Sequence, residues 1–139
     1  MELSDITTPA LAYLGDSVLE VCVRTYLVTE RGLSTSAHLN AASLDFVRAS
    51  AQSEAMGRIE PMLTEQETGY YRRGRNMGHG NVPKSASVAE YRRATGMEVL
   101  FGYLSITGQT QRMNHLFRVG YGLTRPYAGQ QDQSGEQTT

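Results

Sequence analysis

The 139-residue sequence predicts an all-α protein that forms a single helical domain. Apolar residues recur three and four positions apart along most of the chain, a pattern typical of helices that bury one face. Two capping boxes, Thr64 with Glu67 and Ser87 with Glu90, indicate helix starts. A chain of this length can form one modest hydrophobic core. We therefore expect one bundle of helices and no second domain.

The first helix is expected to start at Thr8, a good N-cap residue, with Pro9 in its first turn. Gly32 is expected to end the helical pattern. The apolar positions between these limits are Leu11, Leu14, Val18, Val21 and Leu27. Most of this helix is therefore expected to lie in the core.

A second helix is expected to start at Ser34 or Ser36 and to end before Pro61, because a residue before proline disfavours the helical conformation. The side chains along one side of this helix would be Leu39, Ala42, Phe46, Ala49 and Met56. The pattern thus predicts one continuous helix over this stretch.

The capping box of Thr64 and Glu67 predicts a short third helix that fades into Gly69 and Gly74. The following segment, residues 72–87, contains three glycines and a proline and has no apolar periodicity. Such a composition predicts a loop, with at most short extended pieces.

A fourth helix is expected to start at the capping box of Ser87 and Glu90 and to stop near Gly108. Its apolar positions are Val88, Tyr91, Met97, Leu100, Phe101 and Leu104. A last helix is expected from Thr110 to about Tyr121. Residues 1–125 would then form the domain. Residues 126–139, which are mostly Gln, Gly, Ser and Thr, are expected to be disordered.

The composition limits the compartment and the class of partner. The formal net charge of −1 gives no overall attraction to a polyanion, so an electrostatic argument must be local. A chain with the single cysteine Cys22 cannot form an internal disulfide, and a reducing compartment is the simplest location for it. The Cys22 side chain is expected to be buried in the core. Neither a membrane-spanning run nor a signal-peptide pattern is evident. We expect the cytoplasm, or an organelle stroma after processing.

The stretch LAYLGDSVLE places two acids, Asp16 and Glu20, on one side of the first helix. Acids on helices are commonly solvated surface residues, and that interpretation stays open. The apolar neighbours Leu14, Val18, Leu19, Val21 and Val23 leave little of the helix to water. A carboxylate in such surroundings needs a partner, and a metal ion can stabilise two acids at once.

Glu98 is a third acid within an apolar stretch, GMEVLFG. The flanking Gly96 and Gly102 would let another helix or a substrate backbone come close. The alternative role for Glu98 is a salt bridge to Arg93 or to another arginine.

The segment between Gly69 and Ala89 contains four basic residues and no acid, although the chain is slightly negative. The basic residues are Arg72, Arg73, Arg75 and Lys84, and Asn76 and His79 add hydrogen-bonding groups. Separated positive charge with glycines nearby suits a phosphate-rich polyanion. An ordinary mobile surface loop is the alternative.

Other common sites are not supported by the sequence. The three histidines, His38, His79 and His115, lie far apart and show no metal-ligand spacing. Cys22 has no histidine near it in the sequence that could activate a nucleophile. A glycine-rich phosphate loop ending in Lys-Ser or Lys-Thr is not present.

Two of these motifs carry a resemblance to a known family. The run LGDSVL, residues 14–19, resembles the signature of the ribonuclease III catalytic domain. The stretch GMEVLFGYLSITG is similar to the family's second element, a glutamate in a late helix. The two are correctly ordered and spaced, and the resemblance covers most of residues 8–120. It implies the helical-bundle fold of that domain, assembled as a homodimer.

The positions at which this chain departs from the family pattern indicate which branch of the family it resembles. The larger enzymes have further acids where this chain has Ala12 and Thr95, and they carry a double-stranded-RNA-binding domain that does not follow here. The segments RGRNMGHG and PKSASVAEYRRATGMEVLFGYL resemble the Mini-ribonuclease III branch, which lacks that domain and keeps a reduced acidic set. That branch is associated with trimming the precursor of large-subunit (23S) ribosomal RNA in bacteria and related plastid systems. The resemblance therefore implies the bacterial cytoplasm, with a plastid stroma as the less favoured location.

The resemblance implies a Mg²⁺-dependent endoribonuclease that cuts double-stranded RNA and leaves 5′-phosphate and 3′-hydroxyl ends. Asp16 and Glu98 would be the metal ligands and catalytic residues, with Asp16 held on a buried helix beside Glu98 of the late helix. Glu20 is a weaker catalytic candidate, either an outer base or a salt-bridge partner. Mg²⁺ suits such a site because it binds few carboxylates and keeps several waters.

The remaining expectations concern RNA and assembly. Because A-form RNA exposes phosphates and 2′-hydroxyls, its recognition by shape needs basic groups. The RNA-binding candidates are Arg73, Arg75, Asn76, His79 and Lys84. The dimer is expected to form through Tyr13, Ser17 and Val21 of the first helix. A ribosomal protein that assists cleavage would be a further partner under this resemblance, although no sequence motif identifies it.

Two other functional classes stay open at this point. A catalytically inactive RNA-binding or ribosome-assembly factor could use the same fold, since two of the four family acids are missing. A helical protein-interaction module without a role in RNA is the third reading. Cleavage of duplex RNA that stops when EDTA is added separates the enzyme from both.

Overall fold

The computed structural model describes residues 1–78 and 86–123, and all regular secondary structure in this part of the chain is helical, with no strand. The elements in chain order are η1 (Leu3–Asp5), α1 (Thr8–Thr29), α2 (Ser36–Val47), α3 (Ala49–Ile59), η2 (Glu60–Met62), α4 (Glu65–Arg75), α5 (Val88–Ile106) and α6 (Thr110–Gly120). The all-α prediction is therefore confirmed. None of the described helices is long and apolar enough to cross a membrane.

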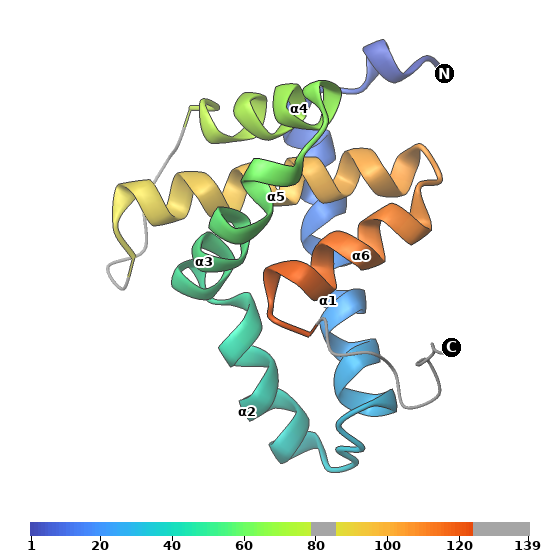
Figure 1. Ribbon diagram of the computed structural model, residues 1–139, viewed down its shortest axis with the longest axis vertical. Helices are drawn as coiled ribbons and strands as arrows, with labels where there is room; N and C mark the ends of the chain where they lie inside the picture. Colours follow the sequence, from blue (N-terminus) through green and yellow to red (C-terminus); the bar gives the residue numbers. More distant parts are fainter. Residues whose placement is uncertain (79–85, 124–139) are drawn as a thin grey trace.

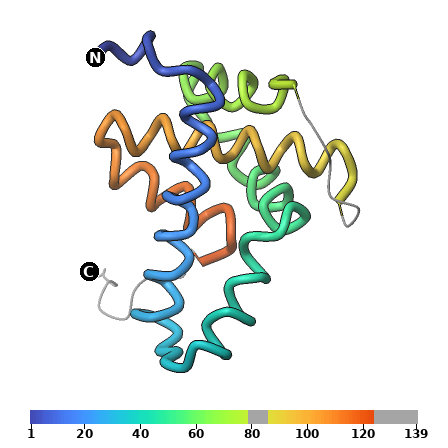
Figure 2. Tube along the Cα trace, turned by 180° about the vertical axis from the view of Figure 1, so that it is seen from behind, coloured from blue at the N-terminus to red at the C-terminus, as the bar shows by residue number. Residues whose placement is uncertain are grey.

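Helix α5 is the central element of the bundle, and α1, α3, α4 and α6 all pack against it (Figure 1). Seen from behind, α1 crosses in front of α5 (Figure 2). The second half of α1 continues away from the crossing and meets α2, so these two helices form a limb at the lower end of the molecule. The crossing of α1 and α5 is where the signature acids of the two helices can meet.

Two glycines allow α1 and α5 to approach closely. A β-carbon added at Gly15 would overlap the backbone of Glu98, and one added at Gly102 would overlap the carbonyl group of Leu11. Residues with side chains at these positions would force the helix axes apart. The glycines thus fix the position at which the helix with Asp16 meets the helix with Glu98.

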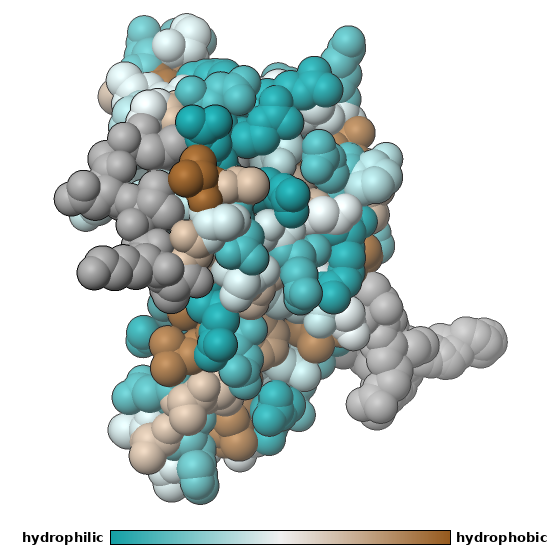
Figure 3. Space-filling model, turned by 90° about the vertical axis from the view of Figure 1, so that its left-hand side faces the viewer, coloured by the Kyte–Doolittle hydropathy of each residue, from teal (hydrophilic) through white to brown (hydrophobic). Residues whose placement is uncertain are grey.

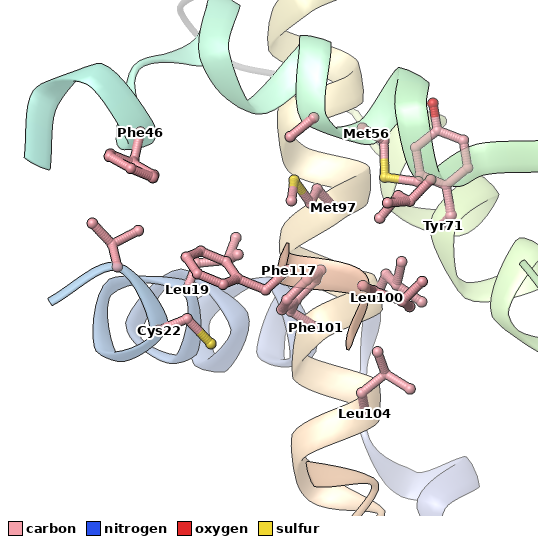
Figure 4. Close-up of a cluster of buried hydrophobic side chains, with 14 of the residues drawn as sticks. Leu19, Cys22, Phe46, Met56, Tyr71, Met97, Leu100, Phe101, Leu104 and Phe117 are labelled. Atoms are coloured by element: carbon pink, nitrogen blue, oxygen red, sulfur yellow. The ribbon is translucent and has the colours of Figure 1, made fainter. Parts of the chain in front are cut away.

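The core lies where the helices converge on α5 (Figure 4). Its largest cluster includes Leu19, Cys22, Phe46, Met56, Tyr71, Met97, Leu100, Phe101, Leu104 and Phe117. Burial raises the pKa of the Cys22 thiol to about 11. The expectation that Cys22 is a buried packing residue is therefore confirmed.

The expectations for the first two helices need correction. The N-cap of α1 is Thr7, whose hydroxyl accepts a hydrogen bond from the Ala10 backbone, while Thr8 is already helical. The expected second helix is two helices, because Arg48 adopts an extended conformation between α2 and α3. The break lets α3 turn toward α5 and bury Met56 against it, whereas α2 packs on α1.

Helix α4 is longer than the sequence predicts. It starts at the expected capping box of Thr64 and Glu67 but continues through both glycines to Arg75. Gly69 meets no neighbour, whereas Gly74 lies tightly against Gly96 and Val99 of α5. Packing on α5 thus offsets the helix penalty of glycine, about 1 kcal/mol per residue.

The later helices agree with the sequence. Ser87 and Glu90 form the expected capping box at the start of α5, and Gly108 adopts a φ of 73° just after the helix ends. Helix α6 covers nearly the expected range. The expected disordered tail, residues 126–139, lies outside the described residues, as do His79 and Lys84.

Candidate active site

The crossing of α1 and α5 brings the carboxylates of Asp16 and Glu98 together. Burial is the main cause that raises the pKa of Glu98, to about 8, and the charge and hydrogen-bonding contact of Asp16 add to it. Glu98 is partly buried, and Asp16 is exposed. Two acids that lie 82 residues apart in the sequence (98 minus 16) therefore form one site.

The expectation that Asp16 is held on a buried helix is wrong. The core side of α1 carries Leu11, Leu19 and Val23, whereas Tyr13 is 83% exposed and Val21 is 63% exposed. One side of α1 faces water because the packing helices cover only the other. The acid pair consequently lies at the edge of the core, where a substrate can reach it.

The donor set fits a divalent cation. With its pKa near 8, Glu98 carries a proton at neutral pH unless a positive charge replaces the proton. Mg²⁺ is commonly bound through one or two carboxylates and keeps several waters. Within the described residues no group of three or more His, Cys, Asp or Glu side chains could hold a metal. The two carboxylates are thus the ligands that this site offers.

Ala12 and Thr95, which stand where the larger family enzymes have acids, lie on the same two helices. Ala12 is buried and packs with Leu11 and Val99. Thr95 is buried, and its hydroxyl donates a hydrogen bond of 3.0 Å to the carbonyl oxygen of Tyr91. Both positions contribute packing and helix bonding, and neither supplies a charge.

The alternative roles of the acids can now be compared with the structure. The Glu20 carboxylate accepts a hydrogen bond of 2.8 Å from Nε of Arg24, one turn further along α1. That contact is the salt bridge considered as the alternative to catalysis. The expected alternative for Glu98 is not formed with Arg93, whose guanidinium donates to the hydroxyl of Ser53 at 2.9 Å.

Three of the four basic residues expected in a loop, Arg72, Arg73 and Arg75, belong to the last turn of α4. The guanidinium of Arg73 donates to the Thr8 hydroxyl at 2.9 and 3.1 Å and lies 4.9 Å from the ring centre of Tyr70. Arg75 lies 5.6 Å from the ring centre of Tyr71 and donates to the side-chain oxygen of Asn76. Arg73 thus joins α4 to the start of α1, whereas Arg75 lies at the junction with α5.

Two arginines near the start of α5 are not among the RNA-binding candidates that the sequence predicts. Arg92 and Arg93 line a hollow of about 390 Å³ together with Arg75, Asn76, Val88 and Ala89. We call this feature the basic hollow. The signal was present as the pair of arginines that follows Tyr91, close to the acid-free segment. Those arginines lie within the predicted fourth helix, and only the packing of α4 on α5 brings them beside Arg75.

The expected dimer residues lie on the exposed side of α1. Ser17 and Val21 line a second hollow of about 560 Å³, formed with Met113 and Phe117 of α6. We call it the α1–α6 hollow. Tyr13 is exposed one turn before Ser17. An apolar surface of this kind is suited to a protein contact.

Comparisons with known proteins give a consistent result. Residues 9–109 match the family described as the Ribonuclease III domain. The chain is 46% identical over 109 residues to the Mini-ribonuclease 3 of Symbiobacterium thermophilum, with 78% of this chain and 82% of that protein covered. It is 33% identical over 122 residues to the Mini-ribonuclease 3 of Clostridium tetani, with 88% and 81% covered.

A solved structure is also similar. A crystal structure of a Fusobacterium nucleatum protein matches with a TM-score of 0.75 and 25% sequence identity. The match covers 83% of this chain and 91% of that one. The arrangement of helices described above therefore also exists in an experimentally determined structure.

Proposed function

Since this chain belongs to the Mini-ribonuclease 3 branch of the ribonuclease III family, and is therefore an endoribonuclease, we propose that it hydrolyses double-stranded RNA at Asp16 and Glu98 with Mg²⁺. The observation that carries this proposal is the contact between the two carboxylates at the crossing of α1 and α5. Two acids forced together at an accessible edge are stabilised when a cation joins them.

Each residue has a defined role in the proposal. Asp16 is exposed and would present its oxygens to the cation and the RNA, while Glu98 would lose its proton as the cation binds. Gly15 fixes the position of Asp16 against the backbone of Glu98. When bound, Mg²⁺ would supply the positive charge that acidifies an attacking water and stabilises the charge developing on the phosphate. Hydrolysis would leave a 5′-phosphate and a 3′-hydroxyl.

The natural substrate that we propose is the precursor of 23S ribosomal RNA in the bacterial cytoplasm. The resemblance to Mini-ribonuclease III supports this assignment, as do the bacterial sources of the relatives. The buried thiol of Cys22 is compatible with a reducing compartment. A ribosomal protein that presents the precursor is the proposed helper, and adding it to the cleavage reaction tests that role.

The working form that we propose is a homodimer. One copy has one acid pair, and a twofold axis would supply a second identical pair for the opposite strand. The exposed side of α1, with Tyr13, Ser17 and Val21, is the proposed contact surface. The α1–α6 hollow would receive side chains of the second copy.

The test is cleavage of a labelled RNA duplex in Mg²⁺ and in EDTA. We expect Asp16→Asn and Glu98→Gln to lower turnover by at least 100-fold without unfolding the protein, since each removes half of the charge that would hold the cation. The control is Asp45→Asn, which removes an exposed carboxylate of α2 that is 74% accessible. Glu20→Gln decides whether Glu20 acts in catalysis or only pairs with Arg24.

The outcomes separate the functional classes. Near-normal turnover of either acid variant at saturating Mg²⁺ would remove that residue from the site. Salt-sensitive binding of the duplex without cleavage by the unmodified protein would favour the inactive RNA-binding factor. Cleavage that continues in EDTA would contradict the metal-dependent mechanism.

A further inference from the structure

The basic hollow lies at the junction between the end of α4 and the start of α5. Arg75 and Asn76 form one side of it, and Val88, Ala89, Arg92 and Arg93 form the other. Figure 3 views the molecule from the side on which α5 begins, where hydrophilic side chains gather toward the top of the face and a small hydrophobic patch lies below them. The hollow is formed by described residues of two well-packed helices, so its shape is largely preformed.

The arginines of the basic hollow are among those that pair with no carboxylate in the described part of the chain, as are Arg31, Arg72 and Arg73. Five other arginines lie within 4 Å of a carboxylate: Arg24 with Glu20, Arg48 with Asp45, Arg58 with Glu54, Arg112 with Glu67, and Arg118 with Glu30. In the described part of the chain, Arg75, Arg92 and Arg93 have no such partner. Three like charges around one hollow repel each other, and an anion between them would remove that repulsion.

The contacts of these side chains leave donors available. Arg75 contacts Asn76 and the Tyr71 ring, and Arg93 uses one guanidinium nitrogen on the hydroxyl of Ser53. Arg92 is exposed and forms no hydrogen bond or ion pair with another described residue. A guanidinium has five N–H donors, so the three groups together can bind several phosphate oxygens.

Two stretches of the chain connect the basic hollow to the region of the acid pair: the residues that follow α4, and α5 itself. Asn76 lines the hollow, and the next residue, Met77, packs on the small cluster of Leu11, Ala12 and Val99 at the crossing of α1 and α5. Along α5, Arg92 precedes Glu98 by six residues, a rise of about 9 Å. Both features therefore lie along α5, the hollow at its junction with α4 and the acid pair at its crossing with α1. A nucleic-acid strand at the acid pair would have further phosphates within reach of the hollow.

We propose that the basic hollow binds a backbone phosphate of the RNA strand, a few nucleotides from the bond that is cut, with Arg92 as its principal contact. This inference rests on the proposed function, because it requires an RNA strand at Asp16 and Glu98. Guanidinium groups bind phosphate oxygens in pairs and do not depend on the base. The site therefore positions duplex RNA by its shape and charge and not by its sequence. The apolar wall of Val88 and Ala89 is suited to the ribose edge between phosphates.

The experiment measures binding of a labelled RNA duplex in EDTA, where the proposed cleavage does not occur, over a range of salt concentrations. We expect Arg92→Gln to weaken binding several-fold and to reduce the slope of log K against log salt by about 0.7 to 0.9, the value for one lost phosphate contact. Arg92→Lys should restore most of the slope. Arg75→Gln should act in the same direction.

The matched control is Arg31→Gln, which removes an equal charge from an exposed residue just after the end of α1. Suppose that the unmodified protein binds and cleaves RNA normally and that the slope is unchanged in Arg92→Gln and Arg75→Gln. This result would contradict phosphate binding by the basic hollow and would leave the proposed function standing. An equal loss of slope for Arg31→Gln would show general attraction and no site. Failure of the unmodified protein to bind the duplex at all would instead overturn the proposed function.

Discussion

Gly15 lies so close to the backbone of Glu98 that a β-carbon at residue 15 would overlap the carbonyl oxygen of residue 98. Asp16 follows Gly15 directly, so this contact between helices carries the Asp16 carboxylate to that of Glu98. The family signature thus combines two requirements in adjacent residues. Gly15 allows the two helices to come together, and Asp16 is thereby placed beside Glu98.

The first prediction concerns this contact. Gly15→Ala should lower the free energy of unfolding by about 3 kcal/mol or more, because overpacking typically costs 1–3 kcal/mol and here the methyl meets rigid backbone. Gly57→Ala is the control, since Gly57 is an exposed helical residue with no neighbour within 4 Å. It should stabilise the protein by about 0.4–1 kcal/mol. Urea unfolding measures both, and equal stability of the two variants would contradict the close approach.

The second prediction concerns pH and the acid pair. The pKa of Glu98 is raised from 4.5 to about 8 in the folded protein, so between these values the folded state holds a proton that the unfolded state has lost. Stability of the metal-free protein should therefore fall as pH rises through this window and level off above it. Urea unfolding in EDTA at pH 6 and pH 9 measures the change. Glu98→Gln should remove most of it.

Added Mg²⁺ provides a further readout of the same pair. The cation requires both carboxylates to be ionised, so it should raise the melting temperature of the unmodified protein more at pH 9 than at pH 6. Glu98→Gln should lose this response. A melting temperature that responds to Mg²⁺ equally in both proteins would place the cation elsewhere.

The third prediction concerns the buried pair of Glu67 and Arg112, which joins α4 to α6. Arg112 donates two hydrogen bonds, of 2.8 and 2.9 Å, to the Glu67 carboxylate, whose side chain is 4% exposed. Arg112→Met should cost about 3–5 kcal/mol in urea unfolding, because it leaves a buried charge without its partner. Arg48→Met, which breaks an exposed pair, should cost at most about 1 kcal/mol.

The same pair should contribute to acid sensitivity. Hydrogen bonds from Arg112 are the main cause that holds the pKa of Glu67 below its usual value of 4.5. The pair therefore stabilises the fold above pH 4.5, and this contribution is lost as pH falls through the lower folded-state pKa. Thermal unfolding between pH 3 and pH 6 measures the effect. Glu67→Gln should reduce this dependence, and an unchanged profile would contradict the assignment.

The fourth prediction concerns the proposed homodimer. Light scattering at micromolar concentration should give about twice the chain mass of 15.3 kDa. Val21→Asp should yield a folded monomer, because Val21 is exposed within one chain and would be desolvated between two. Leu44→Asp, a change at a similarly exposed apolar residue of α2, should leave the dimer intact. A monomer that still cuts both strands in concert would contradict the model of paired sites.

Local signals predicted much of the fold. The capping boxes at Thr64 and Ser87 mark the starts of α4 and α5, and Gly108 follows the end of α5 as expected. Capping acts between residues three positions apart, so the sequence contains the whole interaction. The break at Arg48 was missed because apolar spacing continues across it, and only the packing of α3 on α5 requires the turn.

The sequence by itself determined the helical class and the two acids, because periodicity, capping residues and the resemblance are properties of short stretches. The tertiary structure alone decided that Asp16 is exposed and that the arginines before residue 76 lie on a helix and not in a loop. It also decided that Arg92 and Arg93 share a hollow with Arg75. Exposure and charge clustering depend on which helix faces cover one another. Those contacts join residues far apart in the chain, and no local pattern specifies them.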